Sequence, residues 1–457
     1  MGVSRRVVVT GLGIVSSIGS DPDLFWNNCL EGKSRVAPIP EHWRHYADYH
    51  SSIWATLDPL EPDKLGLTRV EVAQNDPASL IAGNAARQAL TNGGLQLEVF
   101  NKRANSYRLA DVDAQRVGVY MGTGIGGANS FLDNYSVQML GKQKLKLGEI
   151  FSNLSEDDDS RAAIGGIIEL SHHGRRFNPF VVSMLMPNAI SAHIGLKYSI
   201  KGPNLTHSVA CASGTVAIGH AFHAVRDGTV DFAISGGSEY LDDYYGGIFH
   251  GFDIARALVR NCEDPATANR PFDINRSGFL YSQGGAAVLL LEDLDTAVGR
   301  GAPILAEVAG YAETFDAHSV MSIAPDGVQI ERMMNAALAD AGMSHSHIHY
   351  INAHGTGTQA NDTVETEVIG RVFGRDVLVN STKSLVGHTI GASGAIEALV
   401  TVMSLKEQRT HLCKNLEEPL TDLNFAREVT SCSMDAAFTQ SFAFGGHNAG
   451  LVLKRFD

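Results

Sequence analysis

Short runs of apolar, β-branched residues alternate along this chain with amphipathic or small-residue segments. Val7–Val9 is typical of a buried strand, and other such runs lead into glycine-rich turns. Strands that alternate with helices in this way are typical of an α/β fold with parallel strands. The pattern therefore predicts the α/β class.

Three local signatures recur in the same order, which indicates a duplicated unit. They are a strand ending in Gly at 7–11 and 306–310, a strand running into Gly-Thr-Gly at 117–124 and 349–357, and a helix start Ala-Ser-Gly at 212–214 and 392–394. We place the two halves at 1–255 and 256–457. The first half is longer because residues 130–180 form an expected surface insertion, with an acidic tract at 156–159 and two histidines, His172 and His173.

Composition narrows the functional classes. The 457 residues carry a net charge of -14, which disfavours a nucleic-acid binder. No apolar run approaches the length of a membrane span, and the N-terminus lacks the apolar stretch of a signal peptide. The five cysteines are scattered without CxxC pairs, so we expect reduced thiols, no metal site and a cytoplasmic location. They are Cys29, Cys211, Cys262, Cys413 and Cys432.

Cys211 lies where a strand predicted to end at Val209 turns into a small-residue helix that stops near Gly228. The free N–H groups and dipole of a helix N-terminus favour the thiolate, which is the nucleophilic form of cysteine. An inert buried thiol fits this segment equally well, because free cysteines are among the most buried residues. The other four cysteines have no such context.

Two histidines lie at the ends of predicted strands. His354 begins the segment His-Gly-Thr-Gly-Thr-Gln-Ala-Asn-Asp, and His388 ends the segment Ser-Thr-Lys-Ser-Leu-Val-Gly-His. Catalytic groups of α/β proteins gather at the carboxyl ends of strands. A single histidine there is more often structural, but two of them together with Cys211 favour a catalytic site.

A fourth segment, Phe444-Gly445-Gly446-His447, precedes the last predicted strand. Its glycines would let the backbone approach a ligand and present an N–H donor. A simple turn between strands is equally compatible with it.

One motif is misleading. Residues 122–127 match GxGxxG, the fingerprint of dinucleotide binding, but that site needs an acidic residue about twenty positions later. Lys142, Lys144 and Lys146 occupy that neighbourhood, and the next carboxylate is Glu149. Close packing of a loop explains these glycines better.

Together the segments resemble the elongating (type II) β-ketoacyl-acyl carrier protein synthases of the thiolase-like superfamily. The resemblance runs from residues 6–13 to residues 445–448, nearly the whole chain. It implies a five-layered αβαβα fold of two duplicated halves. The nucleophilic cysteine would lie in the first half and the two catalytic histidines in the second.

The resemblance also implies a decarboxylative Claisen condensation. Cys211 would hold the acyl chain as a thioester, and the backbone N–H groups of Cys211 and Phe444 would form the oxyanion hole. His354 and His388 would polarise the malonyl carbonyl. Lys383 matches an electrostatic lysine of the family. The remaining assignments are Glu397, Asp362 and Glu365 as supporting carboxylates, Phe444 as a gate, and Gly445, Gly446, Thr356 and Thr358 as substrate-binding residues.

Related families differ at these positions. Thiolases carry a second cysteine in the C-terminal glycine loop, initiating synthases have Asn where this chain has His388, and chain-length factors lack the nucleophilic cysteine. This chain departs from its own family at Tyr281-Ser282-Gln283, where Gly-Glu/Asp-Gly is usual. The pathway, whether fatty-acid, polyketide or polyene synthesis, stays open.

The implied partner is an acyl carrier protein, which delivers acyl groups on phosphopantetheine, with no other cofactor. Carrier proteins are acidic, so docking onto this acidic chain needs a local basic patch. Lys142, Lys144 and Lys146 are candidates, although scattered surface lysines explain them as well. A homodimer is expected, and a heterodimer with a related chain is open. Two other functions are a non-catalytic subunit that shapes the pocket of a second synthase, and acyl transfer to a free thiol such as coenzyme A.

Overall fold

The computed structural model describes residues 5–156, 159–170, 176–260 and 264–456. Eleven strands form one mixed sheet in the order β14-β12-β11-β16-β17-β10-β1-β9-β8-β6-β7. The half of the sheet around the N-terminal strand holds β1 (Val7–Val15), β6 (Val117–Gly122), β7 (Asn204–His207), β8 (Phe232–Tyr240) and also β9 (Gly284–Asp293), which follows the predicted division at residue 255. The second half supplies β10 (Ala306–Phe315), β11 (Ile348–Asn352), β12 (Leu378–Asn380), β14 (Asn424–Phe425), β16 (Ala436–Phe442) and β17 (His447–Lys454).

Strand order repeats between the halves. β7-β6-β8-β9-β1 in the first half corresponds to β12-β11-β16-β17-β10 in the second, and the two sets meet where β1 pairs with β10. The predicted duplication is therefore present. The division after residue 255 stays a prediction; β9, which follows that point, pairs with β1 and β8.

The expectation of parallel strands holds only in part. β6 is parallel to β7 and β8, and β11 is parallel to β12 and β16. β9 and β17 run antiparallel to their neighbours, because each follows the preceding strand without a crossover that would restore a parallel direction. The α/β class itself is confirmed.

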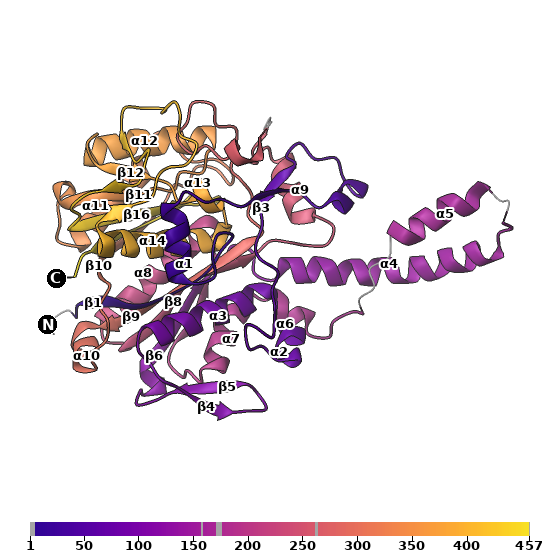
Figure 1. The fold of residues 1–457 in the computed structure, drawn as a ribbon, viewed down its shortest axis with the longest axis horizontal. Coiled ribbons are helices and arrows are strands. Elements are labelled where there is room, and N and C mark those ends of the chain that lie inside the picture. The colour runs from indigo at the N-terminus through magenta and orange to yellow at the C-terminus, as the bar shows by residue number, and fades with distance from the viewer. Residues whose placement is uncertain (1–4, 157–158, 171–175, 261–263, 457) are drawn as a thin grey trace.

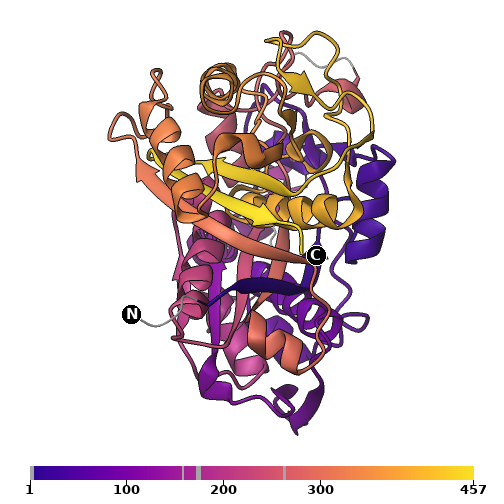
Figure 2. The ribbon, with the colours of Figure 1, turned by 90° about the vertical axis from the view of Figure 1, so that its left-hand side faces the viewer.

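The layers can be followed in Figure 1 and, from the side, in Figure 2. α8 and α14 lie between the two half-sheets, α3 and α7 cover one outer face, and α11 and α12 cover the other. The result is the five-layered αβαβα arrangement that was expected. The helices are α1 (Pro22–Leu30), α2 (Arg69–Gln74), α3 (Pro77–Asn92), α4 (Ala128–Asn153), α5 (Asp159–Leu170), α6 (Val181–Leu185), α7 (Ala189–Lys197), α8 (Ser213–Arg226), α9 (Gly247–Ile254), α10 (Leu294–Gly299), α11 (Val328–Asp340), α12 (Gln359–Phe373), α13 (Lys383–Val386) and α14 (Ser393–Glu407).

The two central helices consist largely of small and apolar residues because both of their faces are covered. Their N-termini touch: a Cβ added at Gly214 would lie 2.7 Å from the backbone N of Ala395, and one at Gly394 would lie 2.1 Å from Oγ1 of Thr215. Only glycine permits this approach. The turns that precede the two helices are thereby brought together in the middle of the molecule.

Three two-stranded sheets lie outside the main sheet: β2 (Val36–Pro38) with β3 (Ile53–Ala55), β4 (Leu97–Asn101) with β5 (Ser106–Leu109), and β13 (Arg409–Thr410) with β15 (Thr430–Ser431). No helix among the described residues is long and apolar enough to cross a membrane. Cys29 and Cys413 are buried, whereas Cys262 lies outside the described residues.

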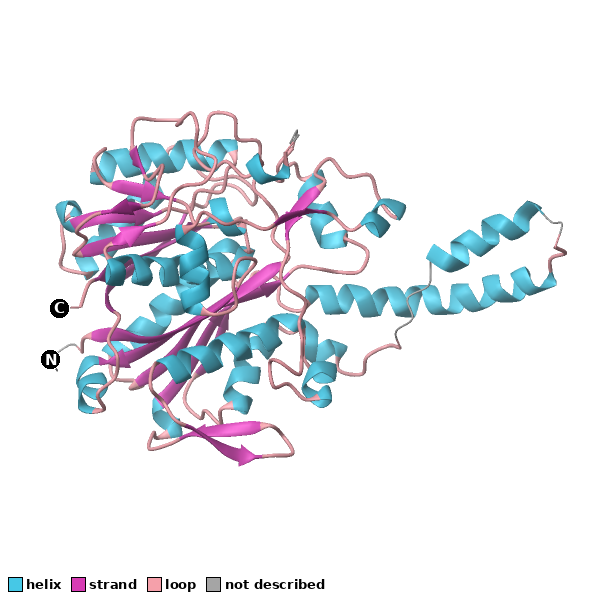
Figure 3. Ribbon diagram, viewed as in Figure 1, coloured by secondary structure: helices cyan, strands magenta, loops and turns pink. Residues whose placement is uncertain are grey.

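The expected insertion is a helical hairpin. α4 and α5 project from the body as a long arm, which Figure 3 shows as a pair of helices standing apart from the sheet. Glu156 of the acidic tract is exposed, while residues 157–158 of that tract and His172 and His173 lie outside the described residues. The surface position predicted for this region is confirmed for its described part.

Candidate active site

Cys211 lies in the turn that joins a strand to a helix, as the sequence predicted. β7 ends at His207, two residues earlier than expected, and a short 3-10 turn at Ala210–Ala212 precedes α8. Ala210 has a φ of +48°, a left-handed conformation that a side chain rarely adopts. This strained turn places the thiol at the end of the helix, where it is only 3% exposed.

Burial decides the ionisation of this thiol. It raises the pKa of Cys211 to about 11, although the Lys383 charge and the backbone N–H groups of Phe444 and Cys211 act in the opposite direction. The N–H groups at the helix start do favour the thiolate, as expected, but burial outweighs them in the resting site. The thiol must lose its proton to a neighbour when it reacts.

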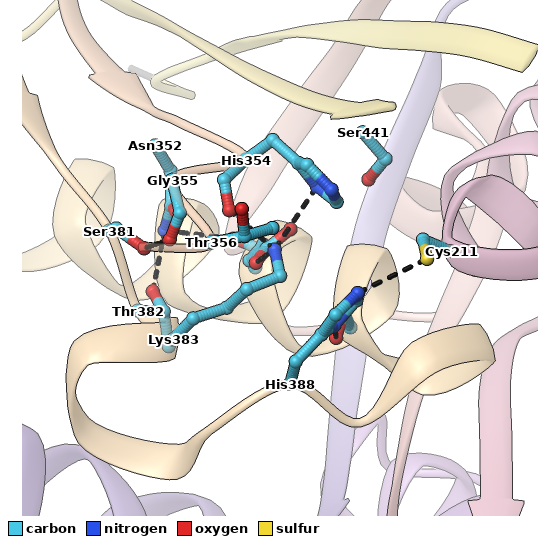
Figure 4. Close-up of polar contacts among 12 residues, drawn as sticks. Cys211, Asn352, His354, Gly355, Thr356, Ser381, Thr382, Lys383, His388 and Ser441 are labelled. Atoms are coloured by element: carbon cyan, nitrogen blue, oxygen red, sulfur yellow. Dashed lines mark hydrogen bonds and ion pairs between the residues drawn. The ribbon is translucent and has the colours of Figure 1, made fainter. Parts of the chain in front are cut away.

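His388 is that neighbour. Its Nε2 lies 3.1 Å from Sγ of Cys211 (Figure 4), and its Nδ1 lies 2.9 Å from Oγ of Ser393. Burial, and secondarily the Lys383 charge, hold the pKa of His388 well below its usual range, so the ring is neutral. Because the Ser393 hydroxyl can donate or accept, the ring can carry its proton on either nitrogen. His388 can thus accept a proton from Cys211 and later donate one to a substrate.

His354 faces the same space from the other strand end. Its ring lies edge-on to that of His388, with centroids 5.5 Å apart. The Lys383 ammonium lies 3.2 Å from Nδ1 of His354 and also donates to the His354 carbonyl at 2.7 Å. An ammonium group can only donate hydrogen bonds, so Nδ1 of His354 must accept from it. The proton of the neutral ring is then held on Nε2. Burial lowers the pKa of His354 far below normal, which keeps this neutral tautomer.

Lys383 is a buried cation with a buried partner. The side chain is 2% exposed, and its Nζ forms an ion pair with Oε1 of Glu397 on α14. Burial raises the pKa of Glu397 to about 7, while the lysine favours its ionised form. The pair holds the charge beside His354 and explains why a lysine can be enclosed here.

Two carboxylates hold the loop that carries His354. Glu365 accepts the backbone N–H groups of His354 at 2.7 Å and Gly355 at 2.8 Å. Asp362 accepts those of Thr356 at 3.1 Å and Gly357 at 3.2 Å. Both lie on α12 and are fully buried, so the helix fixes the loop, as their assignment as supporting residues requires.

The C-terminal glycine loop uses its backbone N–H groups in three different contacts. Phe444 lies beside the site, and its backbone N–H faces Sγ of Cys211. The N–H of Gly445 donates to the Val320 carbonyl at 2.8 Å, and that of Gly446 donates to the Ala443 carbonyl at 2.9 Å. The positive φ values of both glycines shape the turn, and their assignment as substrate-binding residues stays a prediction.

A cavity of about 280 Å³ joins these groups. Cys211, both histidines, Phe444 and the two threonines predicted to bind substrate, Thr356 and Thr358, line it. The two threonine hydroxyls lie 2.9 Å apart. The site therefore offers one thiol, two neutral imidazoles and backbone N–H donors in an enclosed space, an arrangement suited to acyl transfer.

Sequence reasoning missed several contributors. Ser393, which contacts His388, lies in the repeated Ala-Ser-Gly signature, so the repeat itself could have indicated it. Gln440 on β16 donates to Glu365 at 2.7 Å. Its neighbours in sequence gave no indication of a role in the site. The unusual Tyr281 and Gln283 are structural: the first donates to the Leu241 carbonyl at 2.6 Å and the second to Asp242 at 2.9 Å.

Known proteins match the chain over nearly all of its length. Residues 4–296 match the family model described as the beta-ketoacyl synthase N-terminal domain, and residues 305–417 match the corresponding C-terminal domain. The chain is 33% identical to the 3-oxoacyl-[acyl-carrier-protein] synthase 2 of Synechocystis sp. over 99% of both chains, and 33% identical to that of Staphylococcus aureus strain N315 over 100% of both.

Solved structures agree. A beta-ketoacyl synthase from Burkholderia phymatum superposes with a TM-score of 0.82 at 27% identity, covering 99% of this chain and 100% of that one. A type II PKS acyl-carrier protein in complex with its ketosynthase gives a TM-score of 0.80 at 27% identity, with both chains fully covered. The chain therefore belongs to the beta-ketoacyl synthase family and is an acyl-transferring condensing enzyme.

Proposed function

We propose that the chain joins a malonyl thioester to an acyl chain held on Cys211, with loss of carbon dioxide. The observation that carries the proposal is the 3.1 Å contact between Nε2 of His388 and Sγ of Cys211, beside a second neutral imidazole in the same cavity. The family membership supports the same chemistry.

Acyl transfer comes first. Sγ of Cys211 attacks the carbonyl carbon of an acyl thioester, and the C–S bond to the donor thiol breaks. His388 accepts the thiol proton and passes it to the departing thiolate. The backbone N–H groups of Cys211 and Phe444 stabilise the oxyanion that forms during the attack.

Condensation follows. The malonyl thioester loses its carboxylate as carbon dioxide, and the electron pair of the broken C–C bond forms an enolate. His354, whose proton is held on Nε2, and His388 donate to the enolate oxygen. The enolate carbon attacks the acyl thioester carbon, the C–S bond breaks and Cys211 leaves as a thiolate, which takes a proton from solvent by way of His388; the product is a β-ketoacyl thioester. Lys383, Glu397, Asp362 and Glu365 position the two histidines, and Thr356 and Thr358 bind the substrate arm.

The substrates are acyl groups on the phosphopantetheine of an acyl carrier protein, and no other cofactor takes part. The names of the curated relatives and the carrier complex formed by a structural neighbour support this partner. Another neighbour is a ketosynthase/chain length factor. We propose a two-chain assembly, a homodimer in the first instance, working in the cytoplasm on a fatty-acid or polyketide pathway.

Purified protein, acyl-carrier protein and malonyl-carrier protein test the proposal. We expect carbon dioxide, a β-ketoacyl product and an acyl adduct on the wild-type enzyme by intact mass spectrometry. Cys211→Ala should give no adduct and no product, whereas Cys413→Ala, which alters another buried thiol, should keep both. Condensation by Cys211→Ala would refute the proposal. A pocket-shaping subunit would form no adduct, and a thiolase-type enzyme would turn over acetyl-CoA without malonyl groups.

A further inference from the structure

Glu239 is a buried carboxylate at the centre of the molecule that the reaction above does not use. It lies near the end of β8, and its side chain is inaccessible to solvent. Among the described residues no lysine or arginine forms an ion pair with it. Four donors from two segments surround it instead, and this distinguishes it from the lysine-paired Glu397.

The donors come from both halves of the chain. In the first half, Thr123 Oγ1 donates at 2.9 Å, Ile125 N–H at 3.2 Å, and Gly124 N–H also donates. In the second half, Gly391 N–H donates to Oε2 at 3.0 Å. The carboxylate thus joins the loop after β6 to the turn that precedes α14.

The first-half loop in turn holds the nucleophile. Ser213 Oγ donates to the Thr123 carbonyl at 3.0 Å, and Ser208 Oγ donates to the Gly124 carbonyl at 3.2 Å. Ser208 and Ser213 flank the turn at Cys211. Any shift of residues 123–125 would therefore move the thiol.

Gly391 lies two residues before the serine that contacts the base. Ser393, two residues later, contacts Nδ1 of His388 and also accepts the Thr389 N–H at 3.1 Å. A Cβ at position 391 would lie 2.2 Å from Gly124 N and 2.5 Å from Oε2 of Glu239. Only a glycine lets this backbone reach the carboxylate.

We propose that Glu239 is a positioning residue for condensation: it ties residues 123–125 to Gly391 and thereby sets the His388 imidazole against the Cys211 thiol. Its role rests on the proposed function, because the reaction needs this contact. The carboxylate also acts on the thiol through space. Its charge contributes to the raised pKa of Cys211, though less than burial does.

Glu239→Gln tests the proposal because it keeps the shape and removes the charge. The amide NH₂ would face N–H donors, so contacts to the carboxylate are lost and the two turns separate. We expect kcat for condensation to fall about ten- to a hundredfold with little change in KM. The apparent pKa of Cys211, measured from iodoacetamide alkylation against pH, should fall at the same time. Slower condensation by a more acidic thiol is an outcome that mere loss of structure would not give.

Glu292→Gln is the matched control. Glu292 is also fully buried, but it pairs with Arg300 and faces Phe232, at the opposite end of β8. Its variant should keep the alkylation profile and most of kcat. If Glu239→Gln misfolds, Thr123→Val removes a single donor and should lower kcat several-fold.

Two results would overturn the proposal: wild-type kcat with a wild-type alkylation profile in Glu239→Gln, or equal losses in both variants. Alkylation needs no acyl substrate. Failure of the wild-type enzyme to condense would therefore refute the proposed function and leave the alkylation test of Glu239 intact.

Discussion

The turn at Cys211 and the turn at Gly391 are the same structure in two halves of the chain. Ala210 and Ile390 have φ values of +48° and +50°. Ser213 accepts the N–H of Val209, four residues earlier, at 2.9 Å. Ser393 accepts the N–H of Thr389, also four residues earlier, at 3.1 Å. Each turn leads into a buried central helix.

The difference lies in what each copy carries. The first turn presents a thiol, whereas the second presents a backbone N–H in the same position. The connection from strand to turn is short in the first half, at 208–209, and longer in the second, at 381–389, where it carries Lys383 and His388. Duplication gave two equivalent turns, and their divergence divided nucleophile and base between them.

The loops beside these turns diverge in the same way. Thr123 N–H donates to the His207 carbonyl at 3.0 Å, and Ala353 N–H donates to the Asn380 carbonyl at 2.9 Å. The next residue is Gly124 in the first half and His354 in the second. A buried glutamate accepts its backbone N–H in each case. Only the second half uses this position for chemistry.

Substituting alanine at each of the two equivalent positions should impair different properties: activity at position 211 and stability at position 391. Cys211→Ala removes the nucleophile and should lower condensation by about 10⁴-fold or more, but it should fold. Gly391→Ala places a Cβ against backbone and should cost about 3 kcal/mol or more in the free energy of unfolding. Urea unfolding and product assays measure the two effects. Equal stability of both variants would break the comparison.

Substitution of the two histidines should slow different steps of the reaction. His388→Ala removes the proton acceptor of Cys211, so acyl-adduct formation should slow by about 10²- to 10⁴-fold. His354→Ala should leave that step nearly intact and reduce carbon dioxide release from malonyl-carrier protein by a similar factor. Quenched-flow mass spectrometry and ¹⁴CO₂ release distinguish them. Equal slowing of adduct formation in both variants would contradict the division of roles.

Lys383, present only in the longer connection, should matter for stability as well as for chemistry. Lys383→Met leaves Glu397 buried without its partner, and we expect a loss of about 3–5 kcal/mol in the free energy of unfolding. At higher pH the loss should increase. Burial raises the pKa of Glu397 to about 7 although Lys383 lowers it, so without the lysine the pKa lies higher still, and the carboxyl becomes charged, at a cost in stability, only as pH rises toward it. The double variant Lys383→Met/Glu397→Gln should recover part of the loss in urea unfolding.

The alkylation of Cys211 should follow its high pKa. The pKa of about 11 predicts that the rate with iodoacetamide rises about tenfold per pH unit between pH 7 and pH 10, without a plateau. A plateau below pH 9 would show that the helix N-terminus outweighs burial after all. Denatured protein, in which the thiol is solvated, serves as the control and should level off near pH 9.

The smallest effect on activity is expected from the arm formed by α4 and α5. The arm follows the loop after β6, and the second half has no counterpart to it between β11 and α12. Lys142 and Lys146 are exposed on α4. Lys142→Ala/Lys146→Ala should raise KM for the acidic carrier protein two- to fivefold, about 0.4–1 kcal/mol, and the effect should shrink as salt increases. Lys33→Ala, at an exposed site on the body, is the control. An unchanged KM would leave these lysines as scattered surface charges.

The sequence by itself determined the α/β class, the duplication and the residues around which the site is built. It could do so because Cys211 and His354 each follow a strand within a few residues and His388 follows one after a longer connection, all at the carboxyl ends of strands where catalytic groups gather. The resemblance also implied that Asp362 and Glu365 support the His354 loop, and both bond to that loop because they lie on the helix that directly follows it.

Only the tertiary structure decided what depends on distant contacts. The ionisation of Cys211 turned on burial, which no local pattern reports, and the N–H of Gly445 proved to bond to the carbonyl of Val320, far away in the sequence. Glu239, about 150 residues from Gly391 in sequence, became visible only once the two half-sheets brought β8 against the second turn. Burial and backbone pairing are properties of the whole fold, and for that reason the local sequence could not contain them.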